Sequence, residues 1–306
     1  MNLRDLKYLV AVADSRHFGQ AAERCFVSQP TLSGQIKKLE DELGVVLFER
    51  TKRSVELTPI GEAIVEQARN VLEQADAIKQ IALSHQDPLL GPLRMGAIPT
   101  LSPYLMPLVL KPLRKRYPQM KLILSEEYTD TLLTRLNHHE IDAALLATPV
   151  ENPEFESIPL FDEPFWLAHP RSHPLSDKKE LKQKNLNGID MMLLSEGHCL
   201  AEQAMKVCQM KDRNAQSEMA DLRASSLETL LQMVAAGFGC TLVPALALRA
   251  GLAKDRGIMT RQLELPDTYR RVSLVYRRTF PRTQALEAFS ALVCERLPDT
   301  VRSLMN

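Results

Sequence analysis

Apolar side chains in the first 58 residues recur at helical spacing in three short segments separated by tight turns. Leu3, Leu6 and Leu9 fall on one face of the first segment, which predicts an amphipathic helix. Ser28 can cap a third helix that runs to about Leu43, because its hydroxyl can accept from the free N–H groups of a first turn. The second and third helices are expected to share one apolar core, formed by Phe18, Ala21, Ala22, Val27, Leu32, Ile36 and Leu39.

After this helix the pattern changes twice. Val45–Glu49 and Ser54–Thr58 are predicted as short strands around a basic turn. Residues 59–87 are expected to form one long linker helix, because no Gly or Pro interrupts them after Gly61 until the helix ends. Its apolar residues alternate steps of four and three, as in a coiled-coil seam: Ile60, Ile64, Ala68, Val71, Ala75, Ile78 and Ala82. The seam predicts pairing with a second copy of the chain, and packing against its own domain is the alternative.

Residues 91–306 alternate strand-like and helical segments, which predicts an α/β fold. The strands are expected at Leu93–Ala97, Lys121–Ser125, Asp142–Ala147, Phe165–His169, Asp190–Leu194, Cys240–Val243 and Val272–Tyr276. The helices are expected at Pro103–Arg116, Thr129–His138, from His198 onward, at Ser226–Ala236 and at Gln284–Arg296. The last strand and helix resemble the first group, so we expect two lobes, 91–162 with 268–306 and 163–267, and a ligand cleft between them.

Composition narrows the class of protein without pointing to a partner. The chain has 306 residues, 45% hydrophobic and 25% charged, with zero net charge, as in an ordinary soluble protein. It lacks a transmembrane-length apolar run and a signal-peptide core, so we expect a cytoplasmic protein without a membrane partner. Five scattered cysteines without a CxxC spacing argue against a secreted disulfide framework and a zinc site, and no metal or cofactor is expected.

Residues 17–40 have the arrangement of a helix-turn-helix, in which the N-terminal half of the second helix enters the major groove of DNA. The candidate DNA-contacting residues of that half are Gln29, Pro30, Thr31, Ser33 and Gln35. Basic side chains that follow are expected to contact phosphates: Lys38, Arg50, Lys52 and Arg53. The alternative is a structural three-helix domain whose polar residues face water.

The order of these elements resembles the LysR-type transcriptional regulators along the whole chain. The resemblance implies a winged helix-turn-helix DNA-binding domain over 1–58, a linker and dimerisation helix over 59–87, and a redox-sensing effector domain over 91–306 with the two-lobed fold of periplasmic binding proteins. It also implies a double-stranded DNA operator and RNA polymerase as partners, and a homodimer that assembles as a homotetramer.

Two segments are similar, more specifically, to the peroxide-sensing branch of this family: 196–208 and 226–237. This similarity implies that Cys199 and Cys208 are redox-active, that hydrogen peroxide is the signal and that a thiol reductant resets the protein. The residues implied to support the peroxide site are His198, Thr100, Thr129, Glu202 and Arg270, with Arg271 as an alternative to its neighbour. The chain departs from the family at Ala201, where an Arg is expected, and at Glu202, which replaces Asp.

The two cysteines also suggest a chemistry of their own. Gly197 favours a turn into a helix that places Cys199 in its first turn, where the helix dipole and His198 are expected to lower the thiol's pKa. A thiolate attacks peroxide to give a sulfenic acid, which a second thiol can trap as a disulfide. If the intervening stretch is helical, the Cα atoms of Cys199 and Cys208 lie roughly 13 Å apart, whereas a disulfide needs less than about 7 Å. Oxidation would therefore unwind the helix and switch the conformation.

Three functions compete: a redox-responsive regulator, a LysR-type regulator that binds a small metabolite reversibly between its lobes, and a thiol peroxidase. The Cys199/Cys208 pair favours the first over the second, and the helix-turn-helix favours both regulators over the enzyme. We therefore expect a regulator and not an enzyme. Cys25, Cys240 and Cys294 are expected to pack as small hydrophobic side chains.

Overall fold

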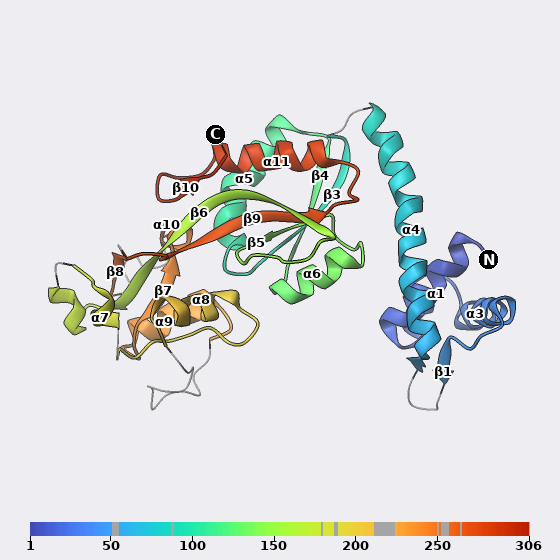
Figure 1. The fold of residues 1–306 in the computed structure, drawn as a ribbon, viewed down its shortest axis with the longest axis horizontal. Helices are drawn as coiled ribbons and strands as arrows, with labels where there is room; N and C mark the ends of the chain where they lie inside the picture. The colour runs from blue at the N-terminus through green and yellow to red at the C-terminus, as the bar shows by residue number, and fades with distance from the viewer. Residues whose placement is uncertain are drawn as a thin grey trace. The chain divides into compact units, whose positions relative to one another are not determined.

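A computed structural model of the 306-residue chain describes residues 1–50, 55–86, 89–178, 180–186, 189–210, 224–249, 251, 257–263 and 265–305. The chain divides into two compact units, Met1–His85 and Gln86–Asn306 (Figure 1). The predicted fold class is confirmed. It comprises a helix-turn-helix with a hairpin, a long helix and a two-lobed α/β domain.

The first unit begins with three helices, α1 (Leu3–Ser15), α2 (Phe18–Arg24) and α3 (Gln29–Leu43). Their ends follow from capping chemistry. The Ser28 hydroxyl accepts from the Thr31 N–H at 3.3 Å and starts α3. Gly44 ends α3 with φ +69, a left-handed conformation that glycine adopts without steric cost. The predicted core is observed, because six of the seven residues named for it are buried and Val27 packs against them.

The hairpin of strands β1 (Phe48–Arg50) and β2 (Val55–Leu57) follows and is antiparallel, with Phe48 opposite Leu57. β1 begins later than predicted, because the Glu40 carboxylate of α3 accepts from the backbone N–H groups of Leu47 and Phe48 at 2.9 and 3.3 Å. The long helix α4 spans Pro59–Gln86, as predicted.

One face of α4 packs against the N-terminal head, formed by α1, α2, α3 and the hairpin, and another face is open to solvent. Val65 and Ala68 are buried in the three-helix core, and Arg69 pairs with Asp14 of α1. Other seam residues remain open in the single chain, since Val71 is 44% and Ile78 69% exposed. Apolar side chains at this spacing need a partner to be buried.

The first lobe of the second unit is built on a mixed sheet in the order β10-β6-β9-β5-β3-β4. The central strands β3 and β5 are parallel, whereas β5, β9 and β6 pair antiparallel. The strands are β3 (Gly91–Ala97), β4 (Met120–Glu126), β5 (Ala143–Leu146), β6 (Phe155–Pro170), β9 (Tyr269–Arg277) and β10 (Arg302–Ser303). The helices packed with them are α5 (Ser102–Arg116), α6 (Thr129–Asn137) and α11 (Thr283–Glu295).

The second lobe packs around the C-terminal half of β6, which pairs with β7 (Thr241–Pro244) and β8 (Ile258–Gln262). Its helices include α7 (Gln183–Leu186), α8 (Cys199–Val207), α9 (Leu227–Ala235) and α10 (Ala245–Arg249), and a 3-10 turn covers Pro174–Asp177. β6 therefore runs through both lobes, as Figure 1 shows.

In this unit one predicted strand is longer than expected and another prediction was wrong. β6 starts ten residues before the predicted Phe165, because its first half pairs with β9 and its second with the other lobe. Asp190–Leu194 forms no strand and makes isolated bridges instead, with Met191 beside Cys240 and Leu194 beside Ala224. The segment is apolar because it is buried in the second core, not because it extends a ladder.

Candidate functional site

Cys199 is the first residue of α8, directly after the turn at Gly197. Gly197 has φ +91, and a Cβ there would lie 3.2 Å from the Tyr128 ring, so a side chain would meet both strain and crowding. Together with Cys199 and His198, this turn closes a small crevice whose opposite wall comes from the first lobe. The crevice is lined by Ile98, Pro99, Thr100, Tyr128, Thr129, Gly197, His198 and Cys199.

Several effects act on the pKa of the Cys199 thiol, and burial is the largest. Burial raises the pKa, while the positive charge of Arg270 and the hydroxyl of Thr129 lower it. The expectation of a net lowered pKa was therefore wrong, because the thiol packs against the core of the first lobe and is largely removed from water. The Thr129 hydroxyl is buried without a nitrogen or oxygen partner among the described residues.

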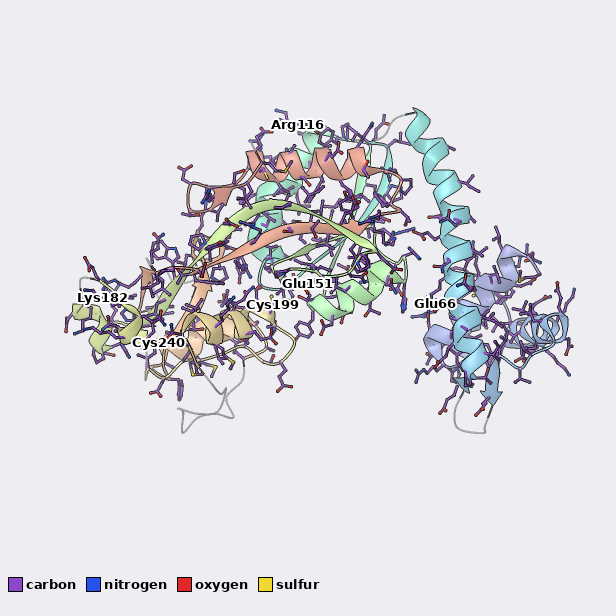
Figure 2. All side chains as sticks on the ribbon, in the orientation of Figure 1. Glu66, Arg116, Glu151, Lys182, Cys199 and Cys240 are labelled. Atoms are coloured by element: carbon purple, nitrogen blue, oxygen red, sulfur yellow. The ribbon has the colours of Figure 1, made fainter. Side chains whose placement is uncertain are left out.

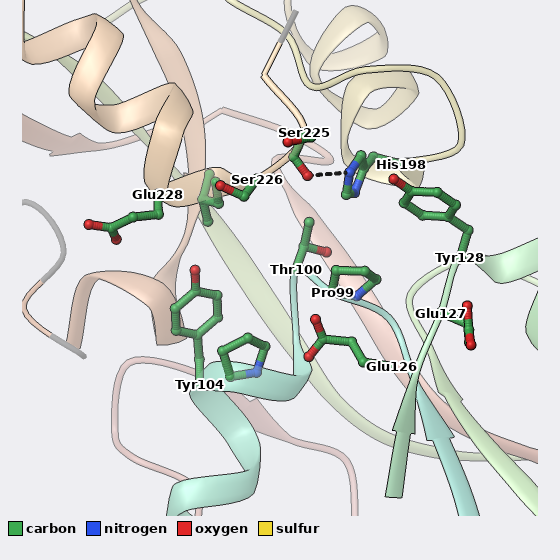
Figure 3. Close-up of a pocket in the computed structure, with 12 residues that line it drawn as sticks. Pro99, Thr100, Tyr104, Glu126, Glu127, Tyr128, His198, Ser225, Ser226 and Glu228 are labelled. Atoms are coloured by element: carbon green, nitrogen blue, oxygen red, sulfur yellow. Dashed lines mark hydrogen bonds between the residues drawn. The ribbon is translucent and has the colours of Figure 1, made fainter.

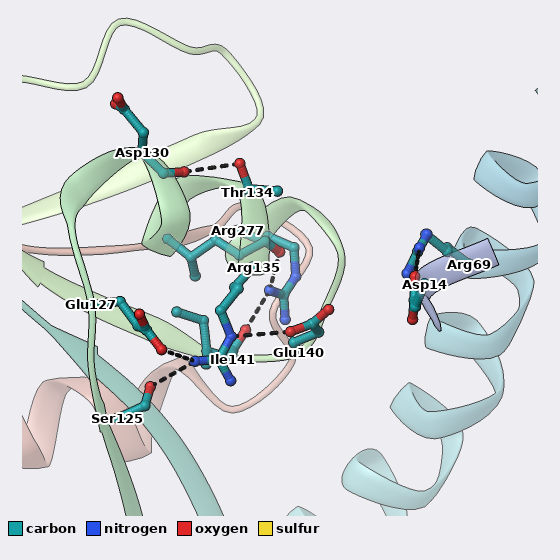
Figure 4. A network of polar contacts seen from close by, with 11 residues as sticks. Asp14, Arg69, Ser125, Glu127, Asp130, Thr134, Arg135, Glu140, Ile141 and Arg277 are labelled. Carbon is teal, nitrogen blue, oxygen red and sulfur yellow. Dashed lines mark hydrogen bonds and ion pairs between the residues drawn. The ribbon is translucent and has the colours of Figure 1, made fainter. Parts of the chain in front are cut away.

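Thr129 owes its position to the network that fixes α6 (Figure 4). Arg135 of that helix donates to Ser125 of β4 at 3.1 Å and to Glu140 at 3.0 Å. Arg277 of β9 donates to the Leu136 and Ile141 carbonyls at 2.6 and 2.7 Å, which holds the C-terminal end of α6. The helix that carries Thr129 is thus tied to the sheet on both sides.

Arg270 belongs to a buried polar cluster where β6 and β9 cross between the lobes. Its Nε donates to Glu163 Oε2 at 2.9 Å, and its two Nη atoms donate to the hydroxyl and carbonyl of Thr100, both at 2.9 Å. The second Glu163 oxygen accepts from the Leu246 N–H at 2.8 Å. Both charged side chains have 0% exposure. The neighbouring Arg271 points elsewhere and pairs with Asp162 while 52% exposed, so Arg270 is the arginine of the thiol site.

Glu163 was not among the site residues predicted from the sequence. The feature that identifies it is the antiparallel register of β6 and β9, which puts Glu163 opposite Arg270 and Asp162 opposite Arg271. Two adjacent acids facing two adjacent arginines would have suggested the pairing, but only once the two strands were aligned.

His198 lies beside the thiol as a neutral ring. Its Nε2–H donates to the Ser225 carbonyl at 3.0 Å, and its ring meets Tyr128 edge to face with centroids 4.7 Å apart. Burial lowers the pKa of His198, so the ring carries no positive charge at neutral pH. Of the two roles open to His198 at Cys199, a donor or a positive charge, the lowered pKa disfavours the positive charge, and its place at the peroxide site stays a prediction.

Two further residues of the first turns of α8 bear on the site. Glu202 is exposed, its charge raises the pKa of Cys199, and it does not line the crevice, so its predicted support of the peroxide site stays a prediction. Ala201 is 1% exposed, so an arginine there would have to leave a packed position. Gln203 donates to the Ala147 carbonyl at 2.7 Å and links α8 to the first lobe.

Cys208 lies at the other end of α8, in the second core. It is 3% exposed, and burial raises its pKa to about 12. Cys240, just before β7, is buried in the same core, and burial together with the charge of Asp190 raises its pKa to about 12. Figure 2 labels Cys199, which packs against the core of the first lobe, and Cys240, which is buried in the core of the second.

A larger cavity of about 540 Å³ adjoins the crevice between the lobes (Figure 3). It shares Pro99, Thr100, Tyr128 and His198 with the crevice, so these residues separate the cavity from Cys199. Three carboxylates and a second phenol also line it: Glu126, Glu127, Glu228 and Tyr104. Burial raises the pKa of Tyr104 to about 12, which keeps its hydroxyl protonated.

The candidate DNA-contacting residues gather at the start of α3. Gln29, Pro30 and Thr31 are exposed, whereas Ser33 and Gln35 are half-buried, less open than expected. The Thr31 hydroxyl lies 2.8 Å from that of Ser28. Basic groups follow on α3 and in the hairpin: Lys38 is exposed, Arg50 ends β1, and Lys52 and Arg53 lie outside the described residues.

A helix-turn-helix head joined to a two-lobed α/β domain with an interlobe cavity defines a ligand-responsive DNA-binding regulator. Family models match both parts: "Bacterial regulatory helix-turn-helix protein, lysR family" over residues 3–62 and "LysR substrate binding domain" over residues 86–298. The chain belongs to the LysR family of transcriptional regulators, in its OxyR branch.

The relatives that define this branch cover almost the whole chain. A hydrogen peroxide-inducible genes activator of Pectobacterium carotovorum is 43% identical over 100% of this chain and 97% of its own length. The dual regulator OxyR of Escherichia coli K12 is 42% identical over 97% and 96% of the two chains.

Solved structures agree with this assignment. A full-length OxyR variant from Pseudomonas aeruginosa matches with a TM-score of 0.81 at 39% identity, covering 100% of this chain and 98% of its own. A hydrogen peroxide-bound cysteine variant of Corynebacterium glutamicum OxyR matches with a TM-score of 0.66 at 34% identity, covering 96% and 92%. Among the described residues, none of the helices is long and apolar enough to span a bilayer.

Proposed function

We propose that this protein is a transcriptional regulator that binds duplex DNA and switches when hydrogen peroxide oxidises Cys199. The observation that carries the proposal is the surroundings of this thiol. Cys199 starts a helix, Arg270 and the Thr129 hydroxyl both favour its thiolate, and that hydroxyl has no nitrogen or oxygen partner of its own among the described residues. A small polar molecule at the crevice would give Thr129 a hydrogen-bond partner. The names of the relatives and the peroxide-bound relative support this substrate.

The reaction needs one peroxide and two thiols. The Cys199 thiolate attacks one peroxide oxygen, the O–O bond breaks, and the other oxygen leaves as hydroxide and takes up a proton. Cys199 is then a sulfenic acid, oxidised by two electrons. The Cys208 thiolate attacks that sulfur and displaces a second hydroxide, which forms the disulfide. A thiol reductant reverses the oxidation by thiol–disulfide exchange.

Disulfide formation requires a change of structure because α8 holds its two ends apart. Over nine helical steps of 1.5 Å, the Cα atoms of Cys199 and Cys208 are separated by roughly 13 Å, about twice the span of a disulfide. Cys208 must leave the second core, and α8 must unwind to bring it to Cys199. This local rearrangement is the switch that would alter DNA binding.

The head and the linker supply the output. We propose that residues 1–58 bind the operator, that 59–87 pair two copies through the exposed apolar side chains of α4, and that 91–306 sense peroxide. The dimers assemble as a homotetramer and contact RNA polymerase at the promoter. The protein works in the cytoplasm, where thiols are kept reduced, and it consumes peroxide once per switching event instead of turning over as an enzyme.

The test is mass spectrometry of the reduced protein after a short peroxide pulse in the presence of dimedone. In Cys208→Ser we expect the dimedone adduct at Cys199, since no second thiol can displace the sulfenic oxygen. In the wild type we expect a peptide linking Cys199 and Cys208. Cys199→Ser should lose both the adduct and the transcriptional response. An adduct at another cysteine, or a full response in Cys199→Ser, would refute the thiol switch.

The cavity of about 540 Å³ favours a second candidate, a regulator that binds a small metabolite reversibly between its lobes. The same Cys199→Ser variant separates the two. A reversible effector would act on it as on the wild type, whereas peroxide would not.

A further inference from the structure

We propose that Glu163 is a positioning residue for the thiol chemistry: it holds the Arg270 guanidinium beside Cys199 and offsets part of its positive charge, which limits the reactivity of the thiol. This inference rests on the proposed function of Cys199. It concerns a residue outside the crevice, since Glu163 contributes nothing to the lining and acts through Arg270 alone.

The geometry makes Arg270 a shared group. One side of its guanidinium binds Thr100, a wall residue of the crevice, through the hydroxyl and the carbonyl. The other side binds Glu163 Oε2, with both Nε and Nη2 at 2.9 Å. Both charged side chains are fully buried, so water does not screen either charge.

Glu163 can affect the Cys199 thiolate because few charged groups act on that thiol. The groups that act on the thiol come from three elements: Arg270 of β9, Thr129 of α6 and Glu202 of α8, while the neighbouring His198 is neutral. Among these groups Arg270 supplies the positive charge that favours the thiolate. An isolated charge acts over a longer range than an ion pair, whose opposite charges partly cancel at a distance. Pairing with Glu163 therefore weakens the attraction between Arg270 and the thiolate.

Neutralising Glu163 is expected to leave Arg270 in place. Thr100 still accepts from both Nη atoms, which keeps the guanidinium at the wall of the crevice. An amide at position 163 has a single acceptor oxygen, so it can accept from the Arg270 Nε–H or from the Leu246 N–H but not from both. The change is thus mainly one of charge, and the uncompensated guanidinium is stabilised most by a thiolate at Cys199.

The structure provides a matched control one residue away. Asp162 pairs with Arg271 on the same two strands, at 2.8 Å, but Arg271 is 52% exposed and lines neither the crevice nor the adjoining cavity. Asp162→Asn removes one carboxylate from the same strand, with the same change in net charge as Glu163→Gln.

The experiment measures the alkylation rate of Cys199 by iodoacetamide against pH in the reduced full-length chain, quantified on the Cys199 peptide. In Glu163→Gln we expect the midpoint to fall by about one pH unit, which increases the thiolate fraction at pH 7 by up to roughly tenfold. Asp162→Asn should leave the midpoint at the wild-type value. An unchanged or raised midpoint in Glu163→Gln, or an equal shift in Asp162→Asn, would overturn the proposal.

If Glu163→Gln does not fold, Glu163→Asp carries the test, because it keeps the charge but draws it back from Arg270. Its midpoint should fall in the same direction by a smaller amount, and no fall would overturn the proposal. The same variants also show separately whether the proposed peroxide sensing at Cys199 fails. Alkylation midpoints that shift as expected, together with a Cys199 that peroxide leaves unmodified in every variant, would preserve the role of Glu163 and refute peroxide sensing.

Discussion

The two ends of α8 place a thiol in two different environments, although the helix has only nine residues. At its start, Cys199 has a cation and a hydroxyl that work against the effect of burial on its pKa. At its end, burial alone acts on Cys208 and raises the pKa to about 12. Both thiols are shielded from water, so the polar partners, not exposure, distinguish the surroundings of Cys199 from those of Cys208.

The two ends also belong to different cores. Cys199 packs against the core of the first lobe, and Cys208 is a buried member of the second. A disulfide between them must therefore remove Cys208 from its core, and the apolar surface of one such side chain is worth about 1–2 kcal/mol. In the proposed switch, this loss of burial would oppose disulfide formation and favour the reduced form.

The largest expected effect comes from removing the cation that distinguishes the Cys199 end. Arg270→Met leaves Glu163 buried without its ion-pair partner, which should lower the free energy of unfolding by about 3–5 kcal/mol in urea titrations. It should also raise the pH midpoint of Cys199 alkylation, because the attraction that favours the thiolate is lost.

The double variant Arg270→Met with Glu163→Leu separates the two effects. It removes both buried charges, so stability should return close to the wild-type value while alkylation stays impaired. Arg271→Met, at an exposed pair, is the control and should leave stability close to the wild-type value. Normal Cys199 alkylation in the double variant would contradict the role given to Arg270.

A smaller effect should distinguish the thiols as packing groups. Cys208→Ser puts a hydroxyl into the apolar second core and should cost about 1–3 kcal/mol of stability. Cys199→Ser should cost much less, because its hydroxyl would face the unpartnered hydroxyl of Thr129. Thermal unfolding under reducing conditions gives both values, with Cys208→Ala as the control for lost volume. Equal losses in the two serine variants would contradict the comparison.

The features that follow from local chemistry were predictable from the sequence. Ser28 caps the start of α3, and the helix ends at Leu43, both as expected, because capping needs only residues within a turn of one another. Cys199 falls in the first turn of α8 for the same reason, after the left-handed Gly197. The apolar pattern was enough to place most helices and central strands.

The features that depend on distant segments were not predictable. The ion pair of Glu163 with Arg270 joins strands more than a hundred residues apart and depends on their register. The sign of the pKa change at Cys199 depends on how much of the fold covers it, which a helix start does not reveal. The neutral state of His198 likewise follows from burial and from a carbonyl on another segment.

The smallest expected effect tests this neutral histidine through pH. Burial lowers the pKa of His198, so as pH falls through about 6.5 the unfolded chain takes up a proton that the folded protein does not. The unfolded state then binds more protons, and stability, complete above that pH, falls until the folded-state pKa is reached. His198→Gln can still donate to the Ser225 carbonyl but cannot titrate, so its urea stability should fall less between pH 7 and 5.5. His173, whose pKa is also lowered by burial, accounts for part of the wild-type slope of stability against pH, and His173→Gln is the control.

Because the ring of His198 is neutral, His198→Gln should leave the alkylation midpoint of Cys199 unchanged at pH 7 and above. A raised midpoint would mean that His198 supports the thiolate as a cation, and the contrast between the two ends of α8 would then rest on two positive charges instead of one.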